Sequence, residues 1–296
     1  MGKVREKRHL VKRQRKTGIL AAVTAMTVMA GYGFHQPGSE ALSGGIVLAG
    51  SSSMEEAANL LAESFMEKYP EVIVTVEFTG SSAGIEAVMA GSADIGNSSR
   101  YLKKEEREKG AEEHIIGFDG IAVCVDGTNG VADLTKEQLS DIFTGKVRNW
   151  ALLGGRDVPV VVIGREAGSG TRSAFEELLN IEGRCTYANE LDSTGAVLAR
   201  IAVTPGAIGY VSFEAAERVG RSEEGGKVRA VSLDGAEPGM TGLEAGEYPL
   251  YRPFIMVTHN GLSRQSPLVR TWFAYVYGSE GRELLRKAGI VPGKLE

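Results

Sequence analysis

Apolar residues in the first part of the chain follow an alternating order of strand and helix patterns. Ile46–Ala49 is a short apolar run, and the polar turn Gly50–Ser53 follows it. Met54–Lys68 then has apolar side chains at helical spacing, whereas Val72–Phe78 has them at every second position. A period near 3.6 favours a helix and a period of two favours a strand. The pattern therefore predicts a strand, a helix and a second strand.

The same strand–turn–helix unit recurs further along the chain. Its turns are Thr79–Gly84, Asn97–Ser99 and Gly164–Gly170, and its helices are expected at Ile85–Ala90, Arg100–Lys109 and Thr171–Asn180. The strands before the last two turns are Ala93–Gly96 and Val158–Ile163. Strands that alternate with helices predict an α/β fold.

Two apolar stretches are predicted to cross between domains. They are Ile115–Val125, interrupted by Asp119 and Gly120, and Tyr248–Thr258. The chain between them is long enough for a domain of typical size. Residues 220–247 are rich in glycine and charge and are predicted to be a surface loop region, whereas Pro267–Ala288 has the apolar spacing of an amphipathic helix.

The net charge of −5 averages two unlike parts of the chain. Residues 1–34 hold eight basic residues and one acidic residue, a net of +7, so the remainder carries −12. A basic start followed by the short apolar run Gly18–Ala30 is typical of an export signal, with an uncleaved membrane anchor as the alternative. The acidic remainder argues against a nucleic-acid partner, which requires a basic face.

Cysteine and histidine do not indicate a metal site or a cofactor. Cys124 and Cys185 lack metal-ligand spacing, and the four histidines are scattered. Cys124 lies in the apolar run Ile121–Val125 and is predicted to be a buried thiol of the core. The sequence leaves open whether the two cysteines pair.

The serine-rich turns indicate an anion site. Helix starts carry unpaired N–H groups, glycine lets a ligand approach the backbone closely, and hydroxyl groups add donors. A single serine at such a turn is more simply a helix cap, but Ser51–Ser53 exceed what one cap needs. Arg165 precedes the turn Gly168–Thr171, and its guanidinium group can bind two oxygens of a tetrahedral oxyanion at once. An ion pair between Arg165 and Glu166 is an equally good interpretation of that spacing.

Two segments partly match motifs of enzymes. Gly80–Gly84 matches the G-x-S-x-G elbow of serine hydrolases, with Ser82 as the nucleophile. Such an enzyme also needs a histidine later in the chain, and only His114 and His259 follow. Gly164–Thr171 lacks the Gly-Lys-Ser/Thr of a phosphate loop, which argues against ATP binding.

A set of motifs then identifies a resemblance. In chain order they are Gly50–Met54, Thr79–Gly84, Ala93–Arg100, Arg165–Arg172 and Pro205–Val211. The chain resembles the phosphate-binding proteins of bacterial phosphate ABC transporters, in the form found in Gram-positive bacteria, over about residues 45–290. The pair Arg-x-x-Gly-Ser-Gly-Thr and Gly-Ala-Ile-Gly-Tyr-Val is the most specific part of this likeness.

The resemblance implies a type II periplasmic binding protein fold, with two α/β lobes joined by two crossing strands. The expected domains are a signal or anchor at 1–34, a linker at 35–44, lobe I at 45–117 plus 253–296, and lobe II at 118–252. The implied ligand is inorganic phosphate in the cleft between the lobes. The implied ligand residues are Ser52, Ser53, Ser81 and Ser99 of lobe I, and Arg165, Ser169, Gly170 and Thr171 of lobe II.

The chain departs from the family pattern in two ways. Ser99 stands where many family members have an aspartate that accepts a hydrogen bond from protonated phosphate. Asp119, at the crossing, is the candidate substitute, with a turn residue before Gly120 as the alternative. Gly31 is followed by Tyr32 rather than by the cysteine that carries a lipid in Gram-positive relatives, so a lipid anchor is not expected there.

The resemblance therefore implies an exported, non-enzymatic monomer without a cofactor. It would bind phosphate and deliver it to a membrane permease, at the outer face of the cytoplasmic membrane, in the cell wall zone or in the periplasm. A receptor for sulfate or molybdate, and a secreted hydrolase that uses Ser82, are the alternatives.

Overall fold

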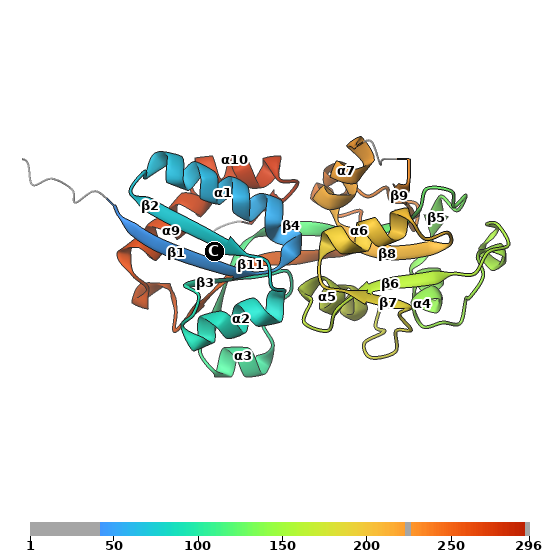
Figure 1. Cartoon of the computed structure of the whole chain (residues 1–296), viewed down its shortest axis with the longest axis horizontal. Helices are drawn as coiled ribbons and strands as arrows, with labels where there is room; N and C mark the ends of the chain where they lie inside the picture. The colour runs from blue at the N-terminus through green and yellow to red at the C-terminus, as the bar shows by residue number, and fades with distance from the viewer. Residues whose placement is uncertain (1–41, 223–225, 294–296) are drawn as a thin grey trace, which may run out of the picture. The chain divides into compact units, whose positions relative to one another are not determined.

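The computed structural model describes residues 42–222 and 226–293, which belong to one compact unit of residues 41–296. A 10-stranded sheet has the order β2-β1-β3-β11-β4-β8-β6-β7, with β12 and β9 also paired to β4. Helices cover both faces of this sheet (Figure 1). The predicted α/β class is confirmed. Among the residues described, no helix is both long and apolar enough to cross a membrane.

One hydrophobic core forms around the β1 end of the sheet. The strands here are β1 (Gly44–Gly50), β2 (Val72–Glu77), β3 (Ile95–Ser98), β11 (Tyr251–His259) and the first part of β4 (Ala111–Asp126). The helices are α1 (Glu55–Lys68), α2 (Ser81–Ala90), α3 (Lys104–Glu108), α9 (Pro267–Tyr277) and α10 (Ser279–Lys287). Phe65 of α1 packs edge-on against Trp272 of α9, so these two helices contact one another through aromatic side chains. We keep the name lobe I for this part.

A second core forms around the β6 end, and we keep the name lobe II for it. Its sheet contains the end of β4, β8 (Ala207–Ser212), β6 (Val161–Arg165), β7 (Asn189–Leu191) and β9 (Val228–Ala230). Its main helices are α4 (Lys136–Phe143), α5 (Gly170–Leu178), α6 (Thr194–Ala202) and α7 (Phe213–Arg221). Phe175 of α5 stacks on Tyr210 of β8, with ring centroids 4.1 Å apart. The smaller elements are β5 (Asp133–Leu134), β10 (Ser232–Leu233), α8 (Met240–Glu244), β12 (Val291–Pro292) and the 3-10 turns η1 (Ser52–Met54), η2 (Trp150–Leu153) and η3 (Leu262–Arg264).

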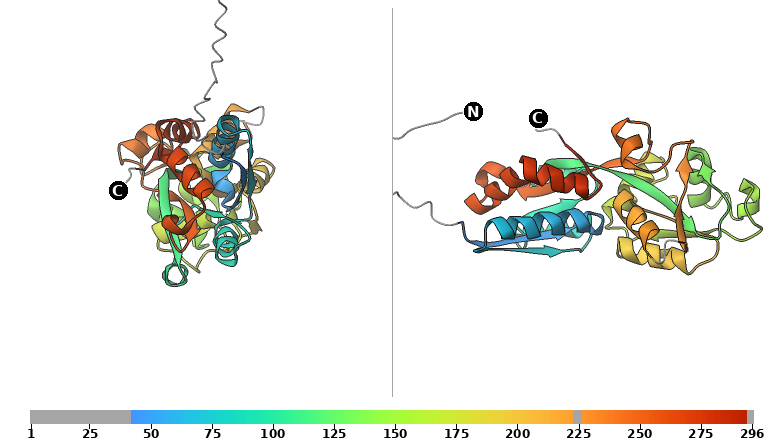
Figure 2. Two further views of the ribbon diagram at one scale, coloured as in Figure 1. Left: turned by 90° about the vertical axis from the view of Figure 1, so that its left-hand side faces the viewer. Right: turned by 90° about the horizontal axis from the view of Figure 1, so that it is seen from above.

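The lobes share a 16-residue strand, β4 (Figure 2). Its first part pairs with β11 over residues 111–120, and its last part pairs with β8 over residues 121–125. The backbone N–H of Ile121 also donates to the carbonyl of Leu250, just before β11 begins. The two predicted crossings are therefore strands β4 and β11 with the residues that lead into β11. The predicted domain limits at residues 117 and 252 fall inside this strand pair and stay a prediction.

Several predicted elements differ in detail. The loop predicted over 220–247 is wrong for the residues described there, because β9, β10 and α8 form and Val231, Leu233 and Leu243 are buried. The helix predicted over Pro267–Ala288 is broken at Gly278 into α9 and α10, and α2 begins at Ser81 rather than at Ile85. Gly44, the last residue of the predicted linker, is the first residue of β1. The predicted signal segment lies outside the described residues.

Cys124 is fully buried in β4, as predicted. Burial raises the pKa of its thiol to about 12, so the neutral thiol is the form at physiological pH. Cys124 and Cys185 are both free thiols, and the question of a disulfide between them is answered in the negative.

Candidate anion-binding site

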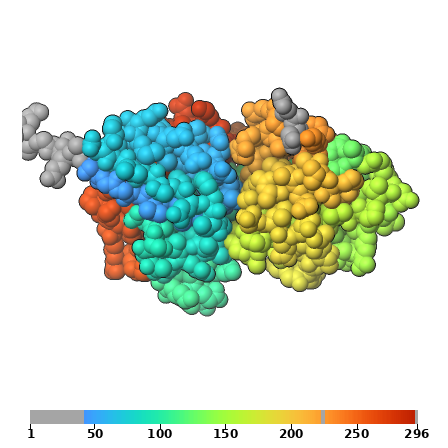
Figure 3. Space-filling model, viewed as in Figure 1, coloured from blue at the N-terminus to red at the C-terminus, as the bar shows by residue number. Residues whose placement is uncertain are grey.

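Helix starts from both lobes meet where the lobes face one another. The space-filling view shows the blue and cyan surface of lobe I against the yellow and orange surface of lobe II along a narrow seam (Figure 3). The elements that begin at this seam are η1 with α1, and α2, α5 and α6. Each helix start leaves backbone N–H groups without an intrahelical acceptor and carries a partial positive charge. The seam is therefore a region rich in donors.

Lobe I contributes a buried group of serine hydroxyls. The Ser51 Oγ lies 2.8 Å from the Ser53 Oγ and donates to the Ser99 Oγ at 3.0 Å. The Ser81 Oγ lies 3.4 Å from the Ser99 Oγ and accepts from the Ser99 backbone N–H at 3.2 Å. All four side chains are buried. Residues from three separate turns of the sequence are thus linked into one hydroxyl network.

Lobe II places the start of α5 directly over this network. A Cβ atom built on Gly170 would lie 2.3 Å from the Ser81 Oγ and 2.7 Å from the Ser99 Oγ. The Thr171 Oγ1 donates to the Ser53 Oγ at 3.4 Å. A side chain at position 170 would therefore require either that the lobes separate or that these serine hydroxyls rotate away.

Two further serines of lobe II act as helix caps. The Ser169 Oγ accepts from the backbone N–H of Arg172, and the Ser193 Oγ accepts from the backbone N–H of Ala196. These bonds satisfy one orphan donor at the start of α5 and one at the start of α6. Ser169 is 1% exposed and therefore lies buried at the seam. Its hydroxyl oxygen already accepts the hydrogen bond from the Arg172 N–H.

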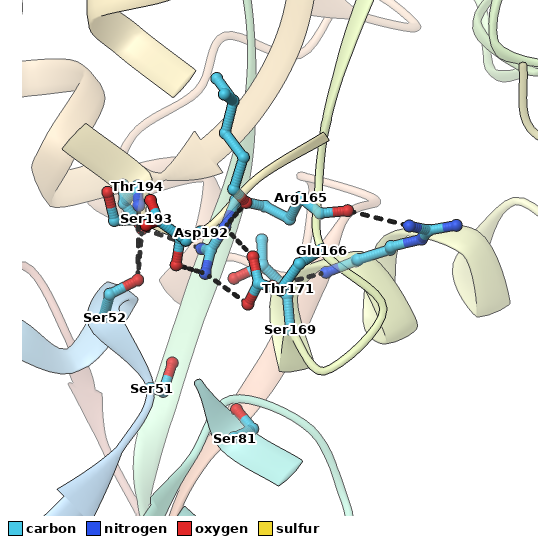
Figure 4. Close-up of polar contacts among 12 residues, drawn as sticks. Ser51, Ser52, Ser81, Arg165, Glu166, Ser169, Thr171, Asp192, Ser193 and Thr194 are labelled. Atoms are coloured by element: carbon cyan, nitrogen blue, oxygen red, sulfur yellow. Dashed lines mark hydrogen bonds and ion pairs between the residues drawn. The ribbon is translucent and has the colours of Figure 1, made fainter. Parts of the chain in front are cut away.

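Arg165 is buried, and most of its donors already have protein acceptors (Figure 4). Its Nε and Nη2 bind the two carboxylate oxygens of Glu166 at 3.1 and 3.0 Å. The same two nitrogens also donate to the carbonyls of Leu191 and Asp192. Its Nη1 donates to the Thr194 Oγ1 at 3.3 Å. The ion pair with Glu166 that the spacing left open is therefore present, although the arginine is not on the surface.

Asp119 lies at the base of the seam in a buried ion pair that the sequence interpretation missed. Its Oδ2 accepts from Arg252 Nη2 at 2.9 Å and from Nε at 3.2 Å, and its Oδ1 accepts from the Phe213 N–H. Burial raises the pKa of the Asp119 carboxyl to about 6, and Arg252 limits that rise. Arg252 Nη1 also donates to the Thr171 Oγ1. Asp119 thus reaches the hydroxyl groups of the seam through Arg252.

A signal for Arg252 was present in the sequence. It is the one charged residue in the apolar stretch Tyr248–Thr258, and charged side chains are rarely buried unless they are paired. Asp119 is likewise the one charged residue in the other crossing segment, Ile115–Val125. The strand register places Arg252 directly opposite Asp119. Two isolated opposite charges in two predicted crossing strands could therefore have indicated this pair.

Thr194 and Ser51 also lie at the seam, although the sequence interpretation did not assign them. The Thr194 Oγ1 lies 3.4 Å from the Ser52 Oγ, and the Thr194 N–H donates to the same oxygen at 3.3 Å. Ser193–Gly195 follows strand β7 and opens α6, so it repeats the Ser, Thr and Gly composition of the other turns. That repetition was the available signal for Thr194.

The predicted residues fall into two groups. Those that the structure brings together at the seam are Ser52, Ser53, Ser81, Ser99, Arg165, Ser169, Gly170 and Thr171. Asp119 stands one residue behind them, next to Arg252. Arg165 and Arg252 each have a carboxylate partner, so the side chains of the site carry little net charge and offer mainly hydroxyl and backbone donors.

Ser82 lacks the surroundings of a hydrolase nucleophile. Its Oγ accepts from Arg100 Nη2 at 3.2 Å, and Arg100 is held by both carboxylate oxygens of Glu106. His114 instead bonds the Thr258 Oγ1 at 2.9 Å on the strands of lobe I. In residues 42–222 and 226–293, no hydrogen bond joins Ser82 to a histidine, and no cluster of His, Cys, Asp and Glu could hold a metal ion.

Comparisons with known proteins identify relatives of this chain. The model of the PBP superfamily domain matches residues 35–280. The phosphate-binding protein PstS of Bacillus subtilis is 35% identical over 216 residues, which cover 72% of this chain and 70% of that protein. The phosphate-binding protein PstS of Borreliella burgdorferi is 28% identical over 226 residues, covering 74% and 79%.

Two solved structures are also similar. One is a candidate phosphate ABC transporter substrate-binding protein with bound phosphate from Clostridium perfringens, with a TM-score of 0.78, 34% identity and coverage of 85% of this chain and 100% of that one. The other is an ABC-type phosphate transport receptor from Vibrio cholerae, with a TM-score of 0.67, 29% identity and coverage of 83% and 99%. The relatives are thus named as binding proteins and receptors, and the match to the family model includes every residue of the site described above.

Proposed function

Because this chain belongs to the PBP superfamily and, within it, to the phosphate-binding proteins of ABC transporters, we propose that it is an exported receptor that binds inorganic phosphate between its two lobes. The observation that carries the proposal is the convergence of hydroxyl groups and helix starts of both lobes around Gly170. An anion that offers only acceptors matches such a set of donors. The receptor would deliver phosphate to a membrane permease as a monomer.

The charges of the site support capture by local donors. The two arginines at the seam are each paired with a carboxylate, and the chain beyond residue 34 carries −12. Long-range attraction therefore does not assist the approach of a phosphate dianion. Short charge-assisted and neutral hydrogen bonds in a buried site, where interactions are stronger than in water, supply the affinity.

We propose export on the basis of the relatives and of residues 1–34. The predicted signal lies outside the described residues, and attachment of the protein by that segment has no support from the structure. Asp119 remains the proposed acceptor for a proton of phosphate, in competition with its bonds to Arg252.

Calorimetric titration of the full-length chain with phosphate, sulfate and molybdate tests the proposed function. We expect phosphate to bind with a dissociation constant of about 1 μM or below, and sulfate to bind at least about a hundredfold more weakly. Sulfate presents four acceptor oxygens and no proton, so it cannot donate the hydrogen bond that protonated phosphate would give to a buried acceptor of the site. Tight binding of sulfate or molybdate in place of phosphate would contradict the proposal, and labelling by a serine-reactive probe that Ser82→Ala abolishes would favour a hydrolase.

The amide of Ser82 is expected to report closure of the lobes. It lies in the first turn of α2 and donates to the Gly168 carbonyl of lobe II at 3.1 Å. Since phosphate would hold the lobes together, its addition should slow hydrogen exchange at the Ser82 amide. The amide of Gly84 is the control, because its acceptor is the Gly80 carbonyl within lobe I. Equal slowing at Ser82 and Gly84 would indicate general stabilisation of the protein rather than closure.

A further inference from the structure

In the described part of the chain, protein acceptors engage four of the five guanidinium N–H groups of Arg165, and the second N–H of Nη1 is left for direct contact with an anion. Four of its contacts, to Glu166, Leu191 and Asp192, use the Nε and Nη2 side of the guanidinium group. Those partners are a carboxylate and two backbone carbonyls, all of which are acceptors that compete with an anion. The remaining contact, from Nη1 at 3.3 Å, goes to the hydroxyl of Thr194.

That contact determines how the Thr194 hydroxyl can be used. A guanidinium group donates hydrogen bonds and accepts none, whereas a hydroxyl has one proton and two lone pairs. Since the Thr194 oxygen accepts from Arg165, its own proton is free to be donated elsewhere. Its neighbour across the seam is the Ser52 Oγ, at 3.4 Å, which is longer than the usual 2.7–2.8 Å of a hydroxyl bond. The Thr194 hydroxyl is thus buried, faces lobe I and is only weakly engaged there (Figure 4).

The same arrangement occurs a second time in lobe II, at the start of α5. Arg252, whose Nε and Nη2 are taken by Asp119, donates through Nη1 to the Thr171 Oγ1. Thr171 in turn faces the Ser53 Oγ at 3.4 Å. Two buried arginines, each neutralised by a carboxylate, therefore each donate to one threonine hydroxyl, which leaves the proton of that hydroxyl available on the side of lobe I. Two independent instances of this geometry argue against a chance contact.

We propose that Thr194 is a further anion-binding residue of the site, and that Arg165, beside its own remaining N–H, orients the Thr194 hydroxyl toward the anion. The inference rests on the proposed function, because it assigns a new contact in the same phosphate site. Toward Thr194, Arg165 is a positioning residue: it donates to the Thr194 oxygen, which leaves the hydroxyl proton for the anion, and it polarises the O–H bond. The start of α6 becomes a fourth helix start at the anion, in addition to those of α1, α2 and α5.

Phosphate titrations of the full-length chain and three variants test this assignment. Thr194→Val removes the hydroxyl at nearly constant shape and should weaken phosphate binding about tenfold, or about 1.4 kcal/mol. Thr194→Ser keeps the hydroxyl and should stay within about threefold of the unchanged protein. Ser193→Ala is the matched control on the same helix, because it removes only the cap and should lower the melting temperature without a comparable loss of affinity.

A double-mutant cycle measures the coupling between Arg165 and Thr194. If Arg165 orients the Thr194 hydroxyl, then Arg165→Lys and Thr194→Val should each cost about tenfold, and the double variant should lose well under about a hundredfold. A loss of about a hundredfold in the double variant would show independent roles and overturn the assignment of Arg165. Wild-type affinity in Thr194→Val would remove Thr194 from the site while the proposed function stands. Absence of phosphate binding by the unchanged chain would instead remove the proposed function, and this inference with it.

Discussion

Gly170→Ala is expected to weaken phosphate binding at least about a hundredfold, or about 2.7 kcal/mol, with little change in stability. The added methyl group would lie 2.3 Å from the Ser81 Oγ and 2.7 Å from the Ser99 Oγ, both in the opposite lobe. Either the lobes must separate, or the serine hydroxyls must rotate away from the ligand. Gly170 is the first residue of α5, where alanine is a favourable helix former, so lobe II should fold normally.

Gly168→Ala provides the matched control two residues earlier in the same loop. A Cβ atom at position 168 would have its nearest neighbour, the Ser82 Cβ, at 3.9 Å, which is an ordinary contact. Calorimetry should therefore find phosphate affinity close to that of the unchanged protein. Equal affinities of the Gly170→Ala and Gly168→Ala variants would show that the ligand does not need the close approach of α5 to lobe I. That result would remove Gly170 from the site.

Arg252→Met is expected to have the largest effect on stability, a loss of about 3–5 kcal/mol at pH 8. The substitution leaves the Asp119 carboxylate buried at 1% exposure without the guanidinium that accounts for two of its hydrogen bonds. For a chain of this size the melting temperature should fall by roughly 10 °C. Lys68→Met, which removes an exposed ion pair with Glu280, is the control and should change stability little.

The pH dependence of this loss identifies its cause. Burial already raises the pKa of Asp119 to about 6, above its ordinary 3.8, so its stabilising contribution is complete below pH 3.8 and is lost as the pH rises through 6. Without Arg252 the pKa rises further, since Arg252 is what lowers it. The difference between variant and unchanged protein should therefore shrink as the pH falls from 8 toward 5.

A second substitution completes the test of the pair. Asp119→Leu combined with Arg252→Met removes both charges and should recover much of the lost stability, because no buried charge is left unpaired. Thermal unfolding of the three proteins at pH 5 and pH 8 is the measurement. An equal loss for Arg252→Met at both pH values would attribute the effect to packing of the long side chain instead of to the unpaired carboxylate.

The Asp119–Arg252 pair also connects the hinge to the site. Both residues lie on the crossing strands, opposite each other in register, and Arg252 contacts Thr171 at the start of α5. The strands that join the lobes thereby hold one of the groups that would meet the ligand. The sequence predicts that Asp119 contacts phosphate. In the structure, Arg252 lies between the Asp119 carboxylate and the hydroxyl groups of the seam.

Local patterning predicted much of this protein. Apolar periodicity identified the strand–helix units of lobe I and the α5 unit of lobe II, because those units bury one face and obey the periods of 2 and 3.6. It misjudged residues 220–247, where buried residues such as Leu233 and Leu243 are isolated among glycine and charged residues. It also missed the break at Gly278, since the apolar spacing continues across that residue while the backbone does not.

The sequence by itself determined which turns carry donors, because serine, threonine, glycine and Arg165 are local features of each strand–helix junction. Tertiary structure alone decided how these groups combine. The pairing of Arg165 with Glu166, the contact of Thr194 with Ser52 and the pairing of Asp119 with Arg252 depend on side-chain direction and on how the lobes and crossing strands meet. Residues 52 and 194 are far apart in the chain, and no local pattern specifies contacts over such separations. Packing of the two lobes brings them together.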